Sequence, residues 1–233
     1  VEDAAESIGS LYKGKHTGTF GKLGALSFNG NKTITTGGGG MMLFQDEELG
    51  ALAKHITTQA KIPHRWEFKH DHIGYNYRMS NIVAGIGRGQ LIHIDEHRAL
   101  KKAIHMRYKE SFASLPLEMN PHLSCSDPNF WLSCILLDKS AKVKPIKIME
   151  ELSKHNIESR PIWKPMHMQP IYRTNPFVTV EGNGRGRTNA YIKGSGIDVG
   201  ADIFRRGLCL PSDIKMTPEQ QDRIIEIIHR CFL

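Results

Sequence analysis

The segment SFNGNKTITTGGGG, residues 27–40, contains one lysine, Lys32, between the hydroxyl of Ser27 and four consecutive glycines. A lysine amine can attack a carbonyl group as a nucleophile. A glycine-rich loop can present its backbone N–H groups to an anion such as phosphate, because no Cβ stands in the way. The lysine precedes the glycines, whereas the Walker phosphate loop has its lysine after them, so a loop of that type is not indicated.

Asp3 supplies an acid that a fold could bring to this segment. VEDAA, at residues 1–5, is typical of the end of a buried strand, and residues 23–28 are typical of a second strand. If the two strands are parallel neighbours, Asp3 and Ser27 emerge at one carboxyl edge, where α/β folds bind ligands, and Lys32 follows on the next loop. A lysine for a Schiff base, an acid for a ring nitrogen and donors for a phosphate are the groups that pyridoxal phosphate requires. The lysine amine would have to be deprotonated, which burial and cationic neighbours would favour.

Strands that alternate with helices are expected around these residues. Residues 41–44 predict a strand, and Asp46 predicts the N-cap of a helix that runs toward Gln59. Ser80 or Asn81 can cap a long helix whose apolar residues recur at helical intervals toward residue 115. This alternation indicates an α/β layered fold.

The pattern restarts after Pro116. Residues 130–137 predict a strand, Pro145 opens a helix, and residues 181–186 predict a polar loop rich in glycine. A last helix is indicated by an N-cap, a first-turn proline and a capping-box partner, at Thr217, Pro218 and Gln220 respectively.

Composition narrows the class of protein. The 233 residues carry 31 Lys and Arg against 24 Asp and Glu, a net charge of +7, but the basic residues are scattered, which favours small anionic ligands over nucleic acid. No apolar stretch approaches the roughly 18 residues of a membrane span, and no signal-peptide pattern is present, so a cytoplasmic protein is expected. The four cysteines have no C-x-x-C spacing, which indicates a reducing compartment.

Several motifs together resemble the DegT/StrS family of pyridoxal-phosphate-dependent nucleotide-sugar aminotransferases, which have the aspartate aminotransferase fold. These motifs are VEDAAESIGSLYKGKHTGTFGKLGALSFNGNKTITTGGGG, GYNYRMSN, RPIWKPMHMQP and GLCLPS. The resemblance implies an α/β fold: residues 1–78 would be the C-terminal part of the cofactor-binding large domain, residues 79–115 a long interdomain helix, and residues 116–233 a smaller α+β domain. Family members have about 100 to 200 residues before the VEDAA strand. The chain is therefore expected to be the C-terminal portion of such an enzyme, with half a cofactor site.

The resemblance also implies roles for individual residues. Lys32 corresponds to the lysine that forms the Schiff base and later moves the proton between cofactor and substrate carbons. Asp3 corresponds to the partner of the ring nitrogen, and Ser27 to a phosphate-binding serine. Asn76, in YNYR, corresponds to an asparagine that reaches the cofactor phosphate of the neighbouring subunit. A homodimer with shared active sites is implied.

Two positions near the cofactor depart from the commonest family pattern. Glu6 stands where many members have glutamine near the ring oxygen, and Gly38 stands where a glutamate is usual. Similar variants occur in the branch that aminates acetamido sugars. In WKPMHMQP, Trp163, Lys164 and His167 are candidates for lining a sugar or diphosphate pocket, although a packing role suits them nearly as well.

The implied reaction is the conversion of a 4-keto-6-deoxy nucleotide sugar to the 4-amino sugar, with glutamate as amino donor. One alternative is a sugar dehydratase of the same family, but those enzymes have histidine where this chain has Lys32. A second alternative is a truncated, non-catalytic fragment that dimerises without cofactor. Plainer interpretations are that Lys32 is a surface lysine, that Asp3 caps a helix and that Ser27 only ends a strand.

Two further patterns carry less weight. His93 and His97 have the spacing of metal ligands on a helix, but HIDEH lacks the glutamate that follows the first histidine of metalloproteases, and no metal site is expected. GNGRG, around Gly184, resembles a dinucleotide fingerprint only superficially, because no strand leads into it.

Overall fold

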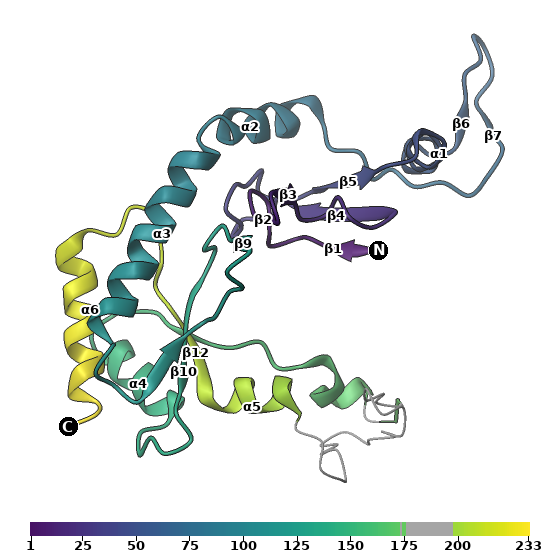
Figure 1. Ribbon diagram of the computed structural model, residues 1–233. Helices are drawn as coiled ribbons and strands as arrows, with labels where there is room; N and C mark the ends of the chain where they lie inside the picture. Colours follow the sequence, from purple (N-terminus) through teal and green to yellow (C-terminus); the bar gives the residue numbers. More distant parts are fainter. Residues whose placement is uncertain (173, 176–197) are drawn as a thin grey trace. The chain divides into compact units, whose positions relative to one another are not determined.

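The computed structural model describes residues 1–172, 174–175 and 198–233 (Figure 1). The chain divides into two compact units. Unit 1 consists of Val1–Lys102 and His122–Trp131, and unit 2 consists of Ala103–Pro121 and Leu132–Leu233. The glycine-rich loop expected at residues 181–186, with its GNGRG motif, lies outside the described residues.

Unit 1 contains a three-stranded sheet in the order β1-β4-β5, with β1 at Glu2–Asp3, β4 at Leu23–Ser27 and β5 at Gly40–Phe44. β1 runs parallel to β4, and β4 runs antiparallel to β5. The two longer strands confirm the predictions from the sequence. A small core covers the sheet, formed by Ala4, Ile8, Leu26, Phe28 and Ile34.

Smaller elements complete this unit. β2 (Leu11–Tyr12), β3 (Lys15–His16) and β9 (Ser126–Asp127) form a sheet in the order β3-β2-β9. α1 (Glu47–Thr57) is followed by the antiparallel pair β6 (Lys61–Ile62) and β7 (Lys69–His70). The predicted cap of α1 is confirmed, because the Asp46 side chain accepts hydrogen bonds from two backbone N–H groups of its first turn.

The stretch expected to be one long helix, residues 79–115, contains two helices. α2 spans Asn81–Leu91, with the Ser80 Oγ accepting from the N–H of Val83, and α3 spans Ile94–Ser111. α2 contains three glycines within its sequence NIVAGIGRGQL, and glycine has a low helix propensity, which favours a break at its end. The division between the two units falls within α3, after Lys102.

Unit 2 is built on an antiparallel sheet in the order β11-β12-β10-β8. Its strands are β8 (Leu117–Met119), β10 (Ser133–Leu137), β11 (Arg160–Pro161) and β12 (Gly207–Leu210). Its helices are α4 (Pro145–Lys154), α5 (Val199–Arg206) and α6 (Pro218–Arg230), with short 3₁₀ turns η1 (Met166–Met168) and η2 (Pro170–Tyr172). All four residues of β12 are buried.

The core of unit 2 lies between this sheet and its helices. Its fully buried side chains include Tyr108 of α3, Phe112 directly after α3, Leu152 of α4 and Ile228 of α6. α6 begins with the predicted capping box, in which Thr217 and Gln220 satisfy each other's backbone N–H groups. The α+β arrangement expected for the C-terminal half is the one observed.

The strand predicted at residues 130–137 was too long at its start. β10 begins at Ser133, because Phe130 has a positive φ of 51° and the N–H of Trp131 donates to the side chain of Asn129 instead of to a neighbouring strand. The residues before it, His122–Trp131, belong to unit 1.

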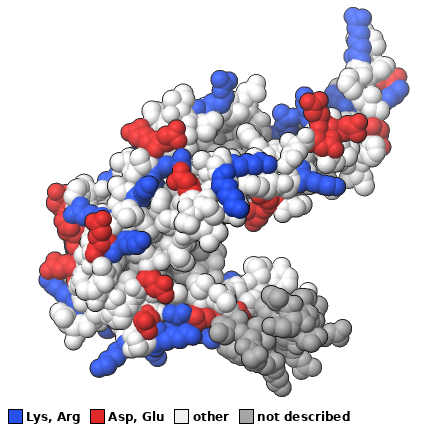
Figure 2. All heavy atoms as spheres, viewed as in Figure 1, with Lys and Arg blue, Asp and Glu red and all other residues white. Residues whose placement is uncertain are grey.

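The surface matches the scattered charge of the sequence. On the face drawn in Figure 2, Lys and Arg side chains are interspersed with Asp and Glu. Among the described residues, no helix combines the length and the apolar character that a membrane span needs.

Candidate active site

Asp3 and Ser27 are the last residues of two neighbouring parallel strands. Asp3 of β1 is in register with Ala25 of β4, two residues before Ser27. Since the strands run in the same direction, both residues lie at the carboxyl edge of the sheet, as the sequence predicted. The Asp3 side chain is exposed and accepts from the N–H of Ala5 at 3.2 Å, and the Ser27 Oγ accepts from the N–H of Asn29 at 3.3 Å. Each side chain therefore shapes the turn after its strand and leaves acceptor capacity at this edge.

The carboxylate of Glu2 anchors β1 to the loop before β4. It accepts hydrogen bonds from the backbone N–H groups of Gly18, Phe20 and Gly21, at 3.2, 2.7 and 2.9 Å. These bonds, with that from Gly21 the largest influence, lower the pKa of Glu2 below its ordinary value. The position of Asp3 thus depends on the carboxylate beside it.

Lys32 lies on the loop after β4, with its amine nearly enclosed. Only 11% of its side chain is exposed. Its Nζ lies 3.0 Å from Oε1 of Glu6 and 4.4 Å from the ring centroid of Trp131. The surface-lysine interpretation is therefore wrong, because this side chain is held between a carboxylate and an aromatic face.

The charge next to Lys32 is the opposite of the one expected. The sequence predicted cationic neighbours, whereas the described ion pair is with the Glu6 carboxylate, whose side chain is 52% exposed. An adjacent carboxylate and an aromatic face both stabilise an ammonium ion. The amine is held by these two contacts, and the pair with Glu6 must loosen before the nitrogen can react.

Two residues that the sequence did not single out, Asn129 and Trp131, complete this site. Asn129 is 5% exposed, and its Nδ2 donates to the backbone carbonyls of Glu6 and Ile8 at 2.9 and 3.0 Å. Trp131 is 8% exposed, and its Nε1 donates to the carbonyl of Asn31 at 2.6 Å. These bonds fix the two loops whose side chains form the Glu6–Lys32 pair.

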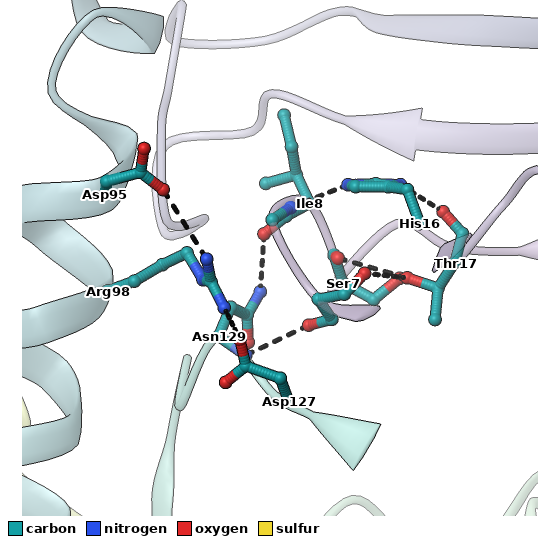
Figure 3. A network of polar contacts seen from close by, with 10 residues as sticks. Ser7, Ile8, His16, Thr17, Asp95, Arg98, Asp127 and Asn129 are labelled. Carbon is teal, nitrogen blue, oxygen red and sulfur yellow. Dashed lines mark hydrogen bonds and ion pairs between the residues drawn. The ribbon is translucent and has the colours of Figure 1, made fainter. Parts of the chain in front are cut away.

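Figure 3 shows how the segment that carries Asn129 is held. Asn129 reaches the loop after β1, and Arg98 of α3 lies between two carboxylates, with its guanidinium 2.6 Å from Asp127 and 3.5 Å from Asp95. The only signal for this in the sequence is DPNFW, a turn-forming proline and asparagine next to two aromatics. Such a pattern indicates a buried turn, but it does not indicate which loop the turn contacts.

The glycine run forms a turn with free space beside it. Gly39 has a φ of +89°, in the region that favours glycine. A Cβ built on Gly40 would lie 2.5 Å from the carbonyl oxygen of Leu26, so β4 and β5 could not pair so closely with a larger residue there. A Cβ on Gly38 would meet nothing within 4 Å, so the departure from the family's glutamate leaves an open position.

Asn76 lies elsewhere in unit 1. It forms a bridge with Thr58 at the end of α1, its side chain is exposed, and among the described contacts it touches neither Lys32 nor Asp3 nor Ser27. An asparagine directed to a neighbouring subunit would have this exposure.

The three candidates for substrate binding lie in unit 2. Trp163 is 57% exposed and Lys164 is also exposed. His167, in η1, has its Nε2 2.6 Å from Oδ2 of Asp198, whose other oxygen accepts from the N–H of Ala201 and so caps α5. Asp198, which the sequence did not indicate, therefore orients the His167 ring and the start of a helix together.

Comparisons with known proteins identify a family that the chain matches. The sequence model of the DegT/DnrJ/EryC1/StrS aminotransferase family matches residues 1–229. EpsN of Bacillus subtilis (strain 168), provisionally named a pyridoxal phosphate-dependent aminotransferase, is 41% identical over 100% of this chain and 56% of its own length. GDP-perosamine synthase of Escherichia coli O157:H7 is 36% identical over 100% of this chain and 58% of its own. The chain thus spans little more than half the length of these relatives.

Solved structures show the same fold. TlmJ, an aminotransferase from Streptoalloteichus hindustanus, superposes with a TM-score of 0.83 at 22% identity and covers 99% of this chain and 57% of its own. PseC of Helicobacter pylori, an aminotransferase involved in the biosynthesis of pseudoaminic acid, has a TM-score of 0.83 at 21% identity, covering 99% and 58%.

Proposed function

The chain belongs to the DegT/DnrJ/EryC1/StrS aminotransferase family, and from this premise we propose that it is the lysine-bearing part of a pyridoxal-phosphate-dependent aminotransferase. The observation that carries the proposal is the enclosed amine of Lys32 on the loop that leaves the β1–β4 edge. The reaction is the amination of a 4-keto-6-deoxy nucleotide sugar, with glutamate as donor. Relatives named GDP-perosamine synthase support the substrate class.

The residues at the sheet edge suit this cofactor. When bound, pyridoxal phosphate supplies an aldehyde that bonds to an amine and a ring that takes up electrons. Lys32 offers the amine, and its Nζ is the atom that accepts and returns the proton. The exposed Asp3 carboxylate would hold the ring nitrogen, and the Ser27 hydroxyl would donate to the phosphate. The open space at Gly38 leaves room for a ligand beside the loop.

Glu6 and Trp131 control the amine. Glu6 holds Nζ in place through their ion pair until a ligand enters. The Trp131 ring covers one side of the amine, which keeps water from that face. Trp163, Lys164 and His167 would bind the sugar and its diphosphate, with His167 oriented by Asp198.

The assembly proposed with this function is a cytoplasmic homodimer with shared sites. The exposed side chain of Asn76 supports this proposal, because a residue that completes the partner's phosphate site must point away from its own subunit's lysine. Residues 1–78 then correspond to the large domain and residues 116–233 to the small one, with His122–Trp131 packed on the former.

One experiment tests whether Lys32 is the lysine that bonds to the cofactor. The chain is mixed with pyridoxal phosphate, absorbance is recorded, the sample is reduced with borohydride, and the modified peptide is located by mass spectrometry. The proposal expects the adduct on Lys32 and its loss in Lys32→Ala, while Lys22→Ala, at an exposed position before β4, retains it. An adduct on another lysine would overturn the mechanism.

A chain extended upstream to the length of its relatives separates the enzyme from the two alternatives, a non-catalytic fragment and a sugar dehydratase. If residues 1–233 give no adduct and the extended chain gives one on Lys32, the enzyme assignment stands and the short chain is a half-site. If neither binds cofactor, the non-catalytic alternative is correct. A dehydratase would release no amino sugar from the keto sugar and glutamate, so product analysis excludes or supports that reading.

A further inference from the structure

Three potential metal ligands meet on the surface of unit 1, outside the candidate active site. His55 lies near the end of α1, and Asp71 and His72 follow β7. One ligand atom from each lies within 4.8 Å of the other two. The Nε2 of His55 is 2.6 Å, and the Nδ1 of His72 is 3.2 Å, from Oδ1 of Asp71. No sequence motif indicates this group, because 15 residues separate His55 from Asp71.

The backbone around the group is fixed by hydrogen bonds between the two segments. The N–H of Ala60 donates to the carbonyl of His55 at 2.8 Å, and the N–H of Asp71 donates to the carbonyl of Ala60 at 3.3 Å. A Cβ on Gly74 would lie 2.3 Å from the carbonyl carbon of Gln59, so the two backbones are in close approach. The three side chains are therefore held near one another by the fold and not only by their mutual contacts.

The ligand types suit a zinc ion. Two imidazoles and one carboxylate are the protein ligands of zinc sites that keep one position open for water. Neighbouring ligands of tetrahedral zinc are about 3.3 Å apart, given Zn–N bonds of about 2.0 Å. The distance from Oδ1 to His72 Nδ1, 3.2 Å, already matches, the distance to His55 Nε2 must open from 2.6 Å, and no two of the three ligand atoms are more than 4.8 Å apart. The exposed fractions of the side chains, 28% for His55, 39% for Asp71 and 64% for His72, give an ion a route from solvent.

We propose that His55, Asp71 and His72 bind a zinc ion through the Nε2 of His55, the Nδ1 of His72 and a carboxylate oxygen of Asp71, with water completing the coordination. The ion would tie the end of α1 to the segment after β7. That segment continues to Asn76, which pairs with Thr58 beyond the same helix. Zinc occupancy would thus stabilise this part of unit 1 whatever cofactor the protein binds.

The test is a zinc titration of protein without a histidine tag, in competition with a chromophoric chelator. We expect one zinc per chain. His55→Gln, Asp71→Asn and His72→Gln should each lower the affinity about tenfold or more, because each removes a ligand. His64→Gln is the matched control: His64 is exposed in the same β6–β7 loop, and its Nδ1 accepts from backbone N–H groups of Trp66 and Glu67 instead of facing the cluster.

A second measurement covers the case of a variant that folds poorly. Cobalt(II) added to the unaltered protein should give the visible absorption of a four- or five-coordinate site with nitrogen ligands, and zinc should abolish it. No zinc uptake by the unaltered protein, or equal affinity in the three variants and the control, would overturn the proposal. Pyridoxal phosphate binding is recorded on the same samples, so that failure of the metal site and failure of the proposed function are seen separately.

Discussion

At the scale of single residues, the reactivity of Lys32 is set by two groups that the chain itself supplies. Glu6 forms an ion pair with the amine, and the Trp131 ring lies over it. A glutamine at this position would hold the amine by a hydrogen bond without the charge. The ion pair with Glu6 is therefore expected to slow the reaction of the Lys32 amine, and the size of this effect can be measured.

Replacing Glu6 with glutamine should speed the reaction of Lys32. Ion pairs with a largely exposed partner are worth roughly 0.2 to 1 kcal/mol, so the rate of adduct formation with pyridoxal phosphate near neutral pH should rise by up to about fivefold. The rate is measured by borohydride trapping at successive times. Glu47→Gln, an exposed position in the first turn of α1, should leave the rate unchanged. An equal rate for Glu6→Gln would show that the carboxylate does not restrain the amine, and a slower rate would show that it helps the reaction.

Asn129→Ala should destabilise unit 1. The substitution leaves the carbonyls of Glu6 and Ile8 and the N–H of Trp131 without their buried partner. Orphaned buried groups cost about 1 to 3 kcal/mol each, partly recovered by relaxation, so a loss of about 2 to 4 kcal/mol in unfolding free energy is expected. Urea unfolding followed by tryptophan fluorescence measures it, since Trp131 is itself buried in this site. Asn81→Ala, at an exposed position, should change little; a similar small effect for Asn129→Ala would contradict the assigned role.

At the scale of elements, the sequence predicted the helix caps and strand ends that depend on residues close to one another along the chain. The cap of α1 at Asp46 and the capping box of α6 were readable because the residues that satisfy each helix end lie within three positions of one another. The position of Asp3 and Ser27 at one edge of the sheet could be predicted, because each residue ends a strand and the two strands are parallel neighbours. The contact of Asn129 with Glu6 was not, because it joins positions 123 residues apart and leaves no periodic pattern.

The early break in the predicted long helix and the late start of β10 have similar causes. Apolar residues continue across both boundaries, so periodicity alone does not mark them. The glycines of α2 favour the end of that helix, and the positive φ of Phe130 delays the start of β10. In both places backbone conformation, and not the hydrophobic pattern, sets the boundary.

β1 offers a prediction on pH. Backbone N–H groups lower the pKa of Glu2 from its ordinary value of 4.5, so the folded state binds this proton less readily than the unfolded state does. The stability contributed by Glu2 is therefore present above its ordinary pKa and is lost as the pH falls through the lowered value. Glu2→Gln should melt at a lower temperature than the unaltered chain near pH 7, and the difference should shrink as the pH falls below 4.5. Glu110→Gln, exposed on α3, serves as control; a difference for Glu2→Gln that stays constant with pH would contradict the anchoring role.

At the scale of the whole molecule, the proposed homodimer would build each active site from the residues of two chains. Lys32 and Asn76 both lie in unit 1, but only Lys32 belongs to the cluster with Glu6, Asn129 and Trp131. The resemblance that identifies both residues assigns Asn76 to the partner's cofactor. A homodimer with shared sites therefore predicts that defects at the two positions fall on different active sites.

Complementation between variants tests this arrangement in the enzyme extended to the length of its relatives. Lys32→Ala and Asn76→Ala should each be inactive or strongly impaired as homodimers. After the two are mixed and allowed to exchange subunits, about half of the dimers are hybrids, and each hybrid has one site with both an intact lysine and the partner's intact asparagine. Amino-sugar formation should then recover to about one quarter of the unaltered rate. The Lys22→Ala variant mixed with unaltered enzyme controls for subunit exchange itself. If the mixture is no more active than its components, Asn76 acts within its own subunit, and the shared-site dimer is wrong even where Lys32 holds the cofactor.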